Sequence, residues 1–162
     1  MTEVQAVPQT SADPDVTSGV AQFLGPVVTD LTALSIDGKQ AHWHVRGANF
    51  QAVHELLDSV VDHARDYADT AAERVVALGL PLDARTQTVG SKATTPVMTA
   101  GFQQADNVIA EVIASIDATL VTVRTAVTEL GELDPVSQDV AIEIARGLEK
   151  DRWFLFAHLA AK

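Results

Sequence analysis

The sequence predicts an all-α protein, a four-helix bundle in which one connection is a long crossover. Three observations support this prediction. Four long segments carry apolar residues at helical spacing, the turns after the first and third segments are short, and the connection between the second and third contains three glycines and two prolines. Strand signals are nearly absent, and 162 residues suit one domain with a single core.

The first long segment covers residues 19–45 and follows a stretch, residues 1–18, that is rich in Thr, Ser, Pro and Asp. That composition favours a flexible N-terminal tail, so we expect the folded domain to span residues 19–162. Pro26 lies inside the segment and should kink the helix or shift its start. Asn49 is the expected N-cap of the second helix, which runs to Leu78.

The connection that follows, residues 79–101, is expected to contain one short helix. The third helix then runs from Phe102 to Leu130, with apolar residues in near-heptad spacing. Asp134 and Pro135 supply an N-cap and a first-turn proline for the fourth helix.

The composition excludes several classes of protein. There are no cysteines, so a metal site must use histidines and carboxylates rather than thiolates. No uncharged apolar run reaches the roughly 18 residues of a membrane span, and the N-terminus lacks the pattern of a secretory signal, so we expect a cytoplasmic protein. The formal net charge of −11 repels nucleic acid and anionic membranes and favours cationic partners, metal ions among them.

The second helix carries a polar stripe whose members recur every three or four residues: His54, Asp58, Asp62, Arg65, Asp69 and Glu73. A solvated helix face is the plain alternative to a functional stripe. Two details favour a metal site. The stripe has one arginine and no lysine, and a histidine lies one turn before an aspartate, a spacing that can chelate one ion. His42 precedes the first turn by about as much as His54 follows it, so the two should lie at one level of an antiparallel hairpin.

Asp69 and Glu73 cannot join this group within one chain. At about 1.5 Å per residue, the pairs 54/58 and 69/73 are separated by roughly 22 Å along the helix. Either the two clusters are unrelated, or a second subunit completes one site. If there is one site, a two-fold axis crossing the helix would set 54/58 of one copy against 69/73 of the other.

Two segments of the sequence resemble the Dps family of mini-ferritins, the DNA-binding proteins from starved cells. The first is Lys39-Gln40-Ala41-His42-Trp43-His44-Val45-Arg46-Gly47-Ala48-Asn49-Phe50, followed by Val53-His54-Glu55 and Asp58. The second is Asp69 with Ala72-Glu73-Arg74 and Leu78-Gly79. The match covers the first two helices continuously and extends more loosely through the fourth. It implies a ferritin-like four-helix bundle.

The resemblance also implies a function, iron storage and detoxification. A ferroxidase of this kind oxidises Fe(II) to Fe(III), preferably with hydrogen peroxide, at centres shared by two subunits, and stores ferric oxide inside a homododecameric shell. It thereby protects against oxidative stress. Each centre would hold two irons, with ligands from one chain and from its two-fold partner: His42, His54 and Asp58, and Asp69 and Glu73. No Glu-x-x-His motif occurs, which argues against ferritins that hold two irons inside one subunit.

Other residues receive supporting roles. Trp43 is a candidate electron donor, with a packed core tryptophan as the alternative, and Lys39 is expected to bridge to a carboxylate across the interface. Glu55 is expected to face the cavity and seed ferric oxide. The resemblance suggests that acidic residues at the start of the fourth helix line a three-fold pore for iron entry, the alternative being an N-cap and ordinary helix charges: Asp134, Asp139 and Glu143. Three further histidines stay outside the expected ligand set: His44, His63 and His158.

DNA binding is not expected. Family members that bind DNA usually do so through a lysine-rich mobile terminus, whereas residues 1–19 contain no Lys or Arg and no basic tail follows the fourth helix. Two other functions stay open on the sequence alone. One is a two-metal hydrolase that uses the same His and carboxylate site, and the other is a DNA-compacting shell without catalysis.

Overall fold

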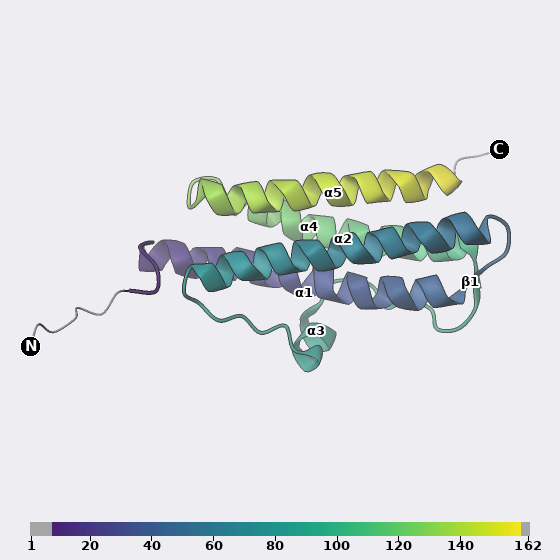
Figure 1. Ribbon diagram of the computed structural model, residues 1–162, viewed down its shortest axis with the longest axis horizontal. Helices are drawn as coiled ribbons and strands as arrows, with labels where there is room; N and C mark the ends of the chain where they lie inside the picture. The colour runs from purple at the N-terminus through teal and green to yellow at the C-terminus, as the bar shows by residue number, and fades with distance from the viewer. Residues whose placement is uncertain (1–7, 160–162) are drawn as a thin grey trace, which may run out of the picture.

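Four long helices lie side by side in the computed structural model of the chain, which describes residues 8–159 (Figure 1). They are α1 (Pro14–His44), α2 (Phe50–Ala77), α4 (Ala105–Leu130) and α5 (Pro135–Leu159). The short helix α3 (Thr86–Lys92) lies in the connection between α2 and α4. The predicted all-α bundle with a helix-containing crossover is therefore confirmed.

Helix α1 begins earlier than residue 19, where it was expected. Asp13 is its N-cap, and the Asp13 carboxylate accepts a hydrogen bond of 2.8 Å from the backbone N–H of Asp15. Pro14 occupies the first turn, where a missing N–H costs nothing. The helix runs through Pro26, so this proline does not shift the start. Residues 1–7 of the expected tail lie outside the described part of the chain.

The turn between α1 and α2 contains a feature that the sequence did not reveal. Strand β1 (Val45–Arg46) pairs in parallel with β2 (Gln103–Gln104), which directly precedes α4. Gly47 has a φ of 99°, a backbone conformation that L side chains rarely adopt, so glycine is favoured at this turn. Asn49 is the N-cap of α2 as predicted, but through a left-handed backbone rather than a side-chain hydrogen bond.

The core consists of apolar side chains that all four long helices turn inward. Fully buried examples are Leu24 and Leu31 of α1, Leu57 of α2, Ile116 of α4 and Leu148 of α5. Helix α1 is long and apolar enough to span a membrane by length and composition, yet 56% of its most apolar window is buried in the bundle. Core packing therefore accounts for more than half of this window.

The crossover is held to the bundle by one buried carboxylate. Asp30 of α1 is only 1% exposed. It accepts hydrogen bonds of 2.7 Å from both the backbone N–H and the hydroxyl of Thr94, which follows α3, and one of 2.6 Å from the hydroxyl of Thr122 in α4. These bonds satisfy the buried carboxyl group and keep the crossover on the α1 side of the bundle.

Candidate metal centre

Two histidines hold each other across the α1–α2 hairpin. Nδ1 of His42 donates to the backbone carbonyl of His54 over 2.9 Å, and Nδ1 of His54 donates to the carbonyl of His42 over the same distance. Their rings stack with centroids 3.6 Å apart. Because a carbonyl can only accept, each Nδ1 carries the proton, and each Nε2 of a neutral ring keeps its lone pair for a metal.

Asp58 lies beside this pair. Its Oδ1 atom is 3.3 Å from Nδ1 of His42 and forms an ion pair with Nζ of Lys39. The hydrogen bond from Lys39 lowers the pKa of Asp58 and outweighs the opposing effect of burial. Asp58 thus stays ionised, as a metal ligand must be. Within the single chain, Lys39 pairs with this carboxylate, and its expected bridge across an interface stays a prediction.

The remaining two expected ligands, Asp69 and Glu73, lie further along the same continuous helix, α2. Both are exposed in the single chain. Within residues 8–159, no group of three or more His, Asp or Glu side chains of one chain is arranged to hold a metal ion. Since α2 is unbroken, the roughly 22 Å between the two pairs is fixed, and one chain cannot bring them together.

Trp43 follows His42 directly, and its side chain is 62% exposed. The alternative of a packed core tryptophan within one chain is therefore wrong. His44, in contrast, bonds through Nδ1 to the carbonyl of Gln40 over 2.8 Å, and its ring lies 5.3 Å from that of Phe102. This separates His44 from the histidine pair.

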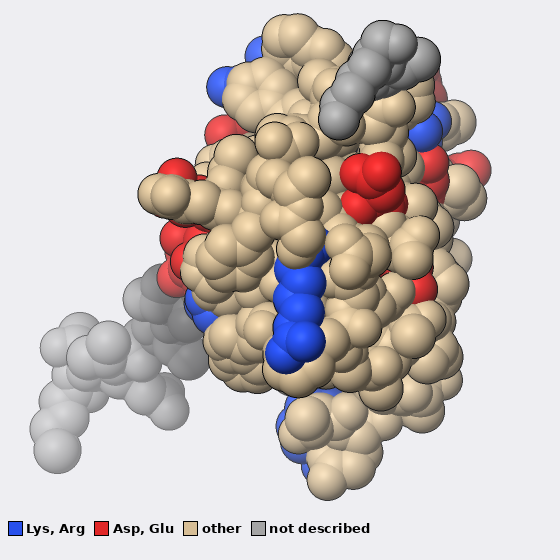
Figure 2. Space-filling view, turned by 90° about the vertical axis from the view of Figure 1, so that its right-hand side faces the viewer, with Lys and Arg blue, Asp and Glu red and all other residues tan. Residues whose placement is uncertain are grey.

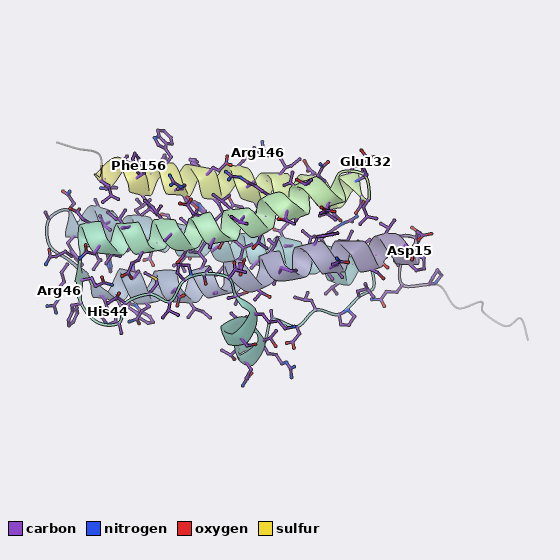
Figure 3. The ribbon with its side chains drawn as sticks, turned by 180° about the vertical axis from the view of Figure 1, so that it is seen from behind. Asp15, His44, Arg46, Glu132, Arg146 and Phe156 are labelled. Atoms are coloured by element: carbon purple, nitrogen blue, oxygen red, sulfur yellow. The ribbon has the colours of Figure 1, made fainter. Side chains whose placement is uncertain are left out.

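The acidic residues assigned to a pore lie at the start of α5, at the end of the bundle opposite His44 and Arg46 (Figures 1 and 3). The Asp134 carboxylate accepts one hydrogen bond of 2.7 Å from the Arg74 guanidinium and a second, short one from the Ser137 hydroxyl. It therefore serves as an N-cap and an ion-pair partner. Two of the other expected residues, Asp139 and Glu143, are exposed. Glu55 is exposed too and accepts a hydrogen bond of 3.0 Å from Gln51.

One polar pair was not foreseen. Nδ1 of His63 in α2 lies 3.0 Å from both carboxylate oxygens of Asp151 in α5, which is 3% exposed. Burial raises the pKa of Asp151, and the hydrogen bond from His63 opposes that rise. The two residues are far apart in the sequence, so no local spacing could have linked them. His158 is the basic residue of the last turn of α5.

Known proteins resemble this chain over most of its length. A model of the ferritin-like domain matches residues 22–161. A structure of Dps from Microbacterium arborescens in the high iron form has a TM-score of 0.90 and 59% identity, covering 93% of this chain and 98% of that chain. A Dps structure from Mycobacterium smegmatis has a TM-score of 0.88 and 30% identity, covering 98% of this chain and 96% of that chain.

A third relative is known from its sequence. The DNA protection during starvation protein of Agrobacterium fabrum is 32% identical over 146 residues, which are 90% of each chain. These matches agree with the helix order and with the paired histidines that lie beside an ionised aspartate. The chain belongs to the Dps family, the iron-storage branch of the ferritin-like proteins.

Proposed function

We propose that this protein oxidises Fe(II) at a centre shared by two copies of the chain and stores the Fe(III) product. His42, His54 and Asp58 of one copy would bind two ferrous ions together with Asp69 and Glu73 of the other. The observation that carries the proposal is the reciprocal pairing of His42 and His54, which fixes both Nδ1 protons and leaves both Nε2 atoms as ligands.

The surface chemistry of the hairpin supports a second copy as the source of the missing ligands. Asp69 and Glu73 are exposed in the single chain, as are Ile36 and Val76, which are 51% and 48% exposed on α1 and α2. Val76 lies beside Glu73 in the lining of one surface hollow, and exposed apolar side chains of this size are typical of a surface that a partner covers. A two-fold axis between Asp58 and Asp69 would make two such centres for each dimer.

The ligand set suits the reaction. Neutral imidazole and carboxylate bind Fe(II), and the carboxylates bind Fe(III) more strongly, so oxidation is favoured. Two Fe(II) ions supply one electron each to hydrogen peroxide, and with two protons they yield two Fe(III) and two water molecules. Because both electrons arrive together, no hydroxyl radical is released. Lys39 holds Asp58 ionised before iron arrives.

Storage requires a closed assembly, for which we propose a homododecameric shell. Asp139 and Glu143, both exposed near the start of α5, are the candidates for lining an iron entry pore, and Glu55 is the candidate for seeding ferric oxide. Asp134 would contribute to such a pore only through its position, because its carboxylate is bonded to Arg74 and Ser137. Trp43 remains the candidate donor of an electron to a stray oxidising equivalent, since it directly follows His42.

Ferrous oxidation with sub-stoichiometric hydrogen peroxide tests the proposal. The double variant His54→Ala, Asp58→Ala should lose at least about 100-fold in initial rate, since removal of metal ligands costs more than the 10–100-fold typical of their supporting groups. Light scattering should show an unchanged assembly. The matched control carries the same two residue types outside the candidate centre, as His158→Ala with Asp106→Ala, and should oxidise iron normally. A normal rate in the first variant would contradict the site assignment.

A further inference from the structure

His63 and Asp151 lie together on a seam between α2 and α5, two helices that pack side by side (Figure 1). Nδ1 of His63 is 3.0 Å from both carboxylate oxygens of Asp151. Because an ionised carboxylate only accepts hydrogen bonds, this nitrogen carries the proton, and Nε2 of a neutral ring keeps its lone pair. Histidines that bind metals usually donate from their other ring nitrogen to a carboxylate or carbonyl. The pair thus has the arrangement that prepares a histidine for metal binding.

The second ring nitrogen of His63 is accessible. The side chain is 45% exposed although its Nδ1 edge rests on a buried carboxylate, so the exposed part is the edge that carries Nε2. One turn further along α2, the ring centroid of Tyr67 lies 6.2 Å from that of His63. The Tyr67 hydroxyl in turn occupies the space over Gly147 that a Cβ would need. His63 is therefore held on two sides and open on a third.

A carboxylate that can share a metal ion with His63 lies on the same helix. Asp66 follows His63 by three residues, a spacing that brings two side chains of a helix within reach of each other. Asp66 is exposed, and among the described residues Thr70 bonds to its backbone carbonyl but no group bonds to its carboxylate. Burial raises the pKa of Tyr67, and three carboxylates raise it further, those of Asp151, Glu143 and Asp66. The seam is therefore rich in negative charge, which attracts cations.

The buried carboxylate of Asp151 also favours a cation on the far side of the imidazole ring. Burial raises the pKa of Asp151, because the charge is removed from water. In the part of the chain that the structure describes, its carboxylate accepts hydrogen bonds from His63 alone, and a neutral imidazole offsets little of the cost of burying a charge. A metal ion on Nε2 would supply positive charge through the ring. One imidazole and one carboxylate suit divalent transition metals.

This seam lies apart from the candidate centre. His63 comes five residues after Asp58 and six before Asp69. At about 100° per residue, it is turned roughly 140° and 120° around α2 from these two ligands. Metal–ligand bonds are only about 2 Å long. An ion at His63 therefore shares no ligand with the candidate centre.

We infer that Nε2 of His63 binds a divalent transition-metal ion, such as Zn²⁺ or Fe²⁺, with the Asp66 carboxylate as second protein ligand and water in the other positions. Asp151 orients the ring and strengthens it as a ligand. Two protein ligands agree with the absence, within residues 8–159, of any group of three or more suited to a metal. They also let the ion exchange, because closed structural sites use four protein ligands. The inference goes beyond the proposed function and does not depend on it.

Zinc binding to the assembled full chain tests the inference, by isothermal titration calorimetry in the His54→Ala, Asp58→Ala background. Because this background lacks the candidate centre, the outcome is independent of the proposed function. His63→Gln keeps an amide that can donate to Asp151 but lacks the ring nitrogen, and it should bind one Zn²⁺ fewer per chain. Equal binding with and without His63→Gln would overturn the inference.

His44→Gln is the matched control. Nδ1 of His44 also donates to an oxygen, the carbonyl of Gln40, over 2.8 Å. However, His44 has no acid three or four residues away, and it lies at the end of the bundle shown in Figure 2, where most of the surface is uncharged. The number of bound Zn²⁺ ions should therefore stay the same. A loss equal to that in His63→Gln would mean that zinc binds histidines without selection, and would overturn the assignment.

Substitutions of the two carboxylates test their roles. Asp151→Asn keeps a hydrogen-bond acceptor but removes the charge behind the ring, and should weaken zinc binding at His63 about 10–100-fold. Asp66→Asn removes a ligand and should weaken it by at least about tenfold. Asp106→Asn, which removes an exposed acid from the first turn of α4, controls for net charge and should have an effect of less than about twofold. Equal effects of Asp66→Asn and Asp106→Asn would contradict Asp66 as a ligand.

If His63→Gln fails to assemble, zinc-soaked crystals of the His54→Ala, Asp58→Ala protein decide. An anomalous zinc peak about 2.0–2.1 Å from Nε2 of His63 would support the site, and the lack of a peak there would overturn it.

Discussion

Lys39 and Asp58 form an ion pair between α1 and α2 at the level where His42 and His54 hold each other. The pair keeps the ligand carboxylate ionised down to a lower pH, because the hydrogen bond from Lys39 lowers the pKa of Asp58. Lys39 therefore prepares the candidate centre for a cation, although it carries a positive charge itself.

Replacing Lys39 with methionine should change the pH dependence of iron oxidation. Without the ammonium group, the pKa of Asp58 should return toward the ordinary value of about 4, so the acidic limb of the initial rate should move to higher pH. At neutral pH the rate should be little changed. A stopped-flow series between about pH 4 and 7 measures this, with the exposed Lys92→Met as control. Superimposable profiles for both variants and the unmodified protein would show that Lys39 has no such role.

Asp134 should stabilise the protein through its charge. Burial would raise its pKa, but hydrogen bonds from Ser137 and Arg74 outweigh this and lower it. The folded chain thus keeps Asp134 ionised to a lower pH than the unfolded chain does. The resulting stability is present above about pH 4 and is lost as the pH falls through the folded pKa.

The variant Asp134→Asn keeps an N-cap oxygen but loses the ion pair with Arg74. It should cost about 1 kcal/mol at pH 7, or a few degrees in the unfolding midpoint. The difference from the unmodified protein should shrink at lower pH, as calorimetry at fixed protein concentration can show. Glu132→Gln, a change of an exposed acid in the same turn, should have little effect at any pH. If the loss of stability in Asp134→Asn is the same at every pH, the charge of Asp134 does not stabilise the folded protein.

His63 should stabilise the folded protein, because it pairs with the buried carboxylate of Asp151. In His63→Ala, Asp151 loses the hydrogen bond that opposes its raised pKa, so that pKa should rise further. The folded variant would then hold a proton that the unfolded chain has released at neutral pH. Its stability should therefore fall as the pH rises from about 4 toward 7.

We expect a loss of about 1–3 kcal/mol for His63→Ala at neutral pH, since a buried acceptor is left without its donor. Adding Asp151→Asn removes the buried charge and should recover part of the loss, which thermal unfolding at several pH values would reveal. Equal pH dependence of the single and double variants would contradict the interpretation of this pair.

DNA should not bind to this protein near neutral pH, although several relatives are named for DNA protection. The net charge of −11 on each chain repels phosphates, and assembly multiplies that charge. A mobility-shift assay at low salt should show no retardation of duplex DNA. Fusing a lysine-rich segment to the N-terminus serves as the positive control and should produce binding that weakens with added salt. Retardation by the unmodified protein would disprove this expectation.

The sequence predicts those features that depend on spacing within one helix. The four long helices and the crossover follow from apolar periodicity, and the level of His42 against His54 follows from a short antiparallel turn. The earlier start of α1 is missed when residues 1–18 are judged by composition, although Asp13 and Pro14 carry a helix-start signal.

Pairs that depend on tertiary packing could not be predicted in this way. His63 and Asp151 meet only because α2 and α5 pack together, and the strands β1 and β2 meet only because the crossover returns beside the α1–α2 turn. Lys39 was singled out from the sequence, but its partner within the chain was not. Its bridge to a carboxylate across the interface stays a prediction, and its ion pair with Asp58 in the same chain depends on side-chain geometry that spacing does not reveal.

Mixed assemblies provide the most direct test of whether two chains share each centre. One variant lacks His54 and Asp58, the other lacks Asp69 and Glu73, all changed to alanine, and neither should oxidise iron alone. When equal amounts are dissociated and reassembled together, half of the dimers should be mixed, and each of these regains one complete centre of its two. The mixture should then oxidise Fe(II) at about one quarter of the unmodified rate. A mixture as inactive as its components would contradict a centre built from two chains.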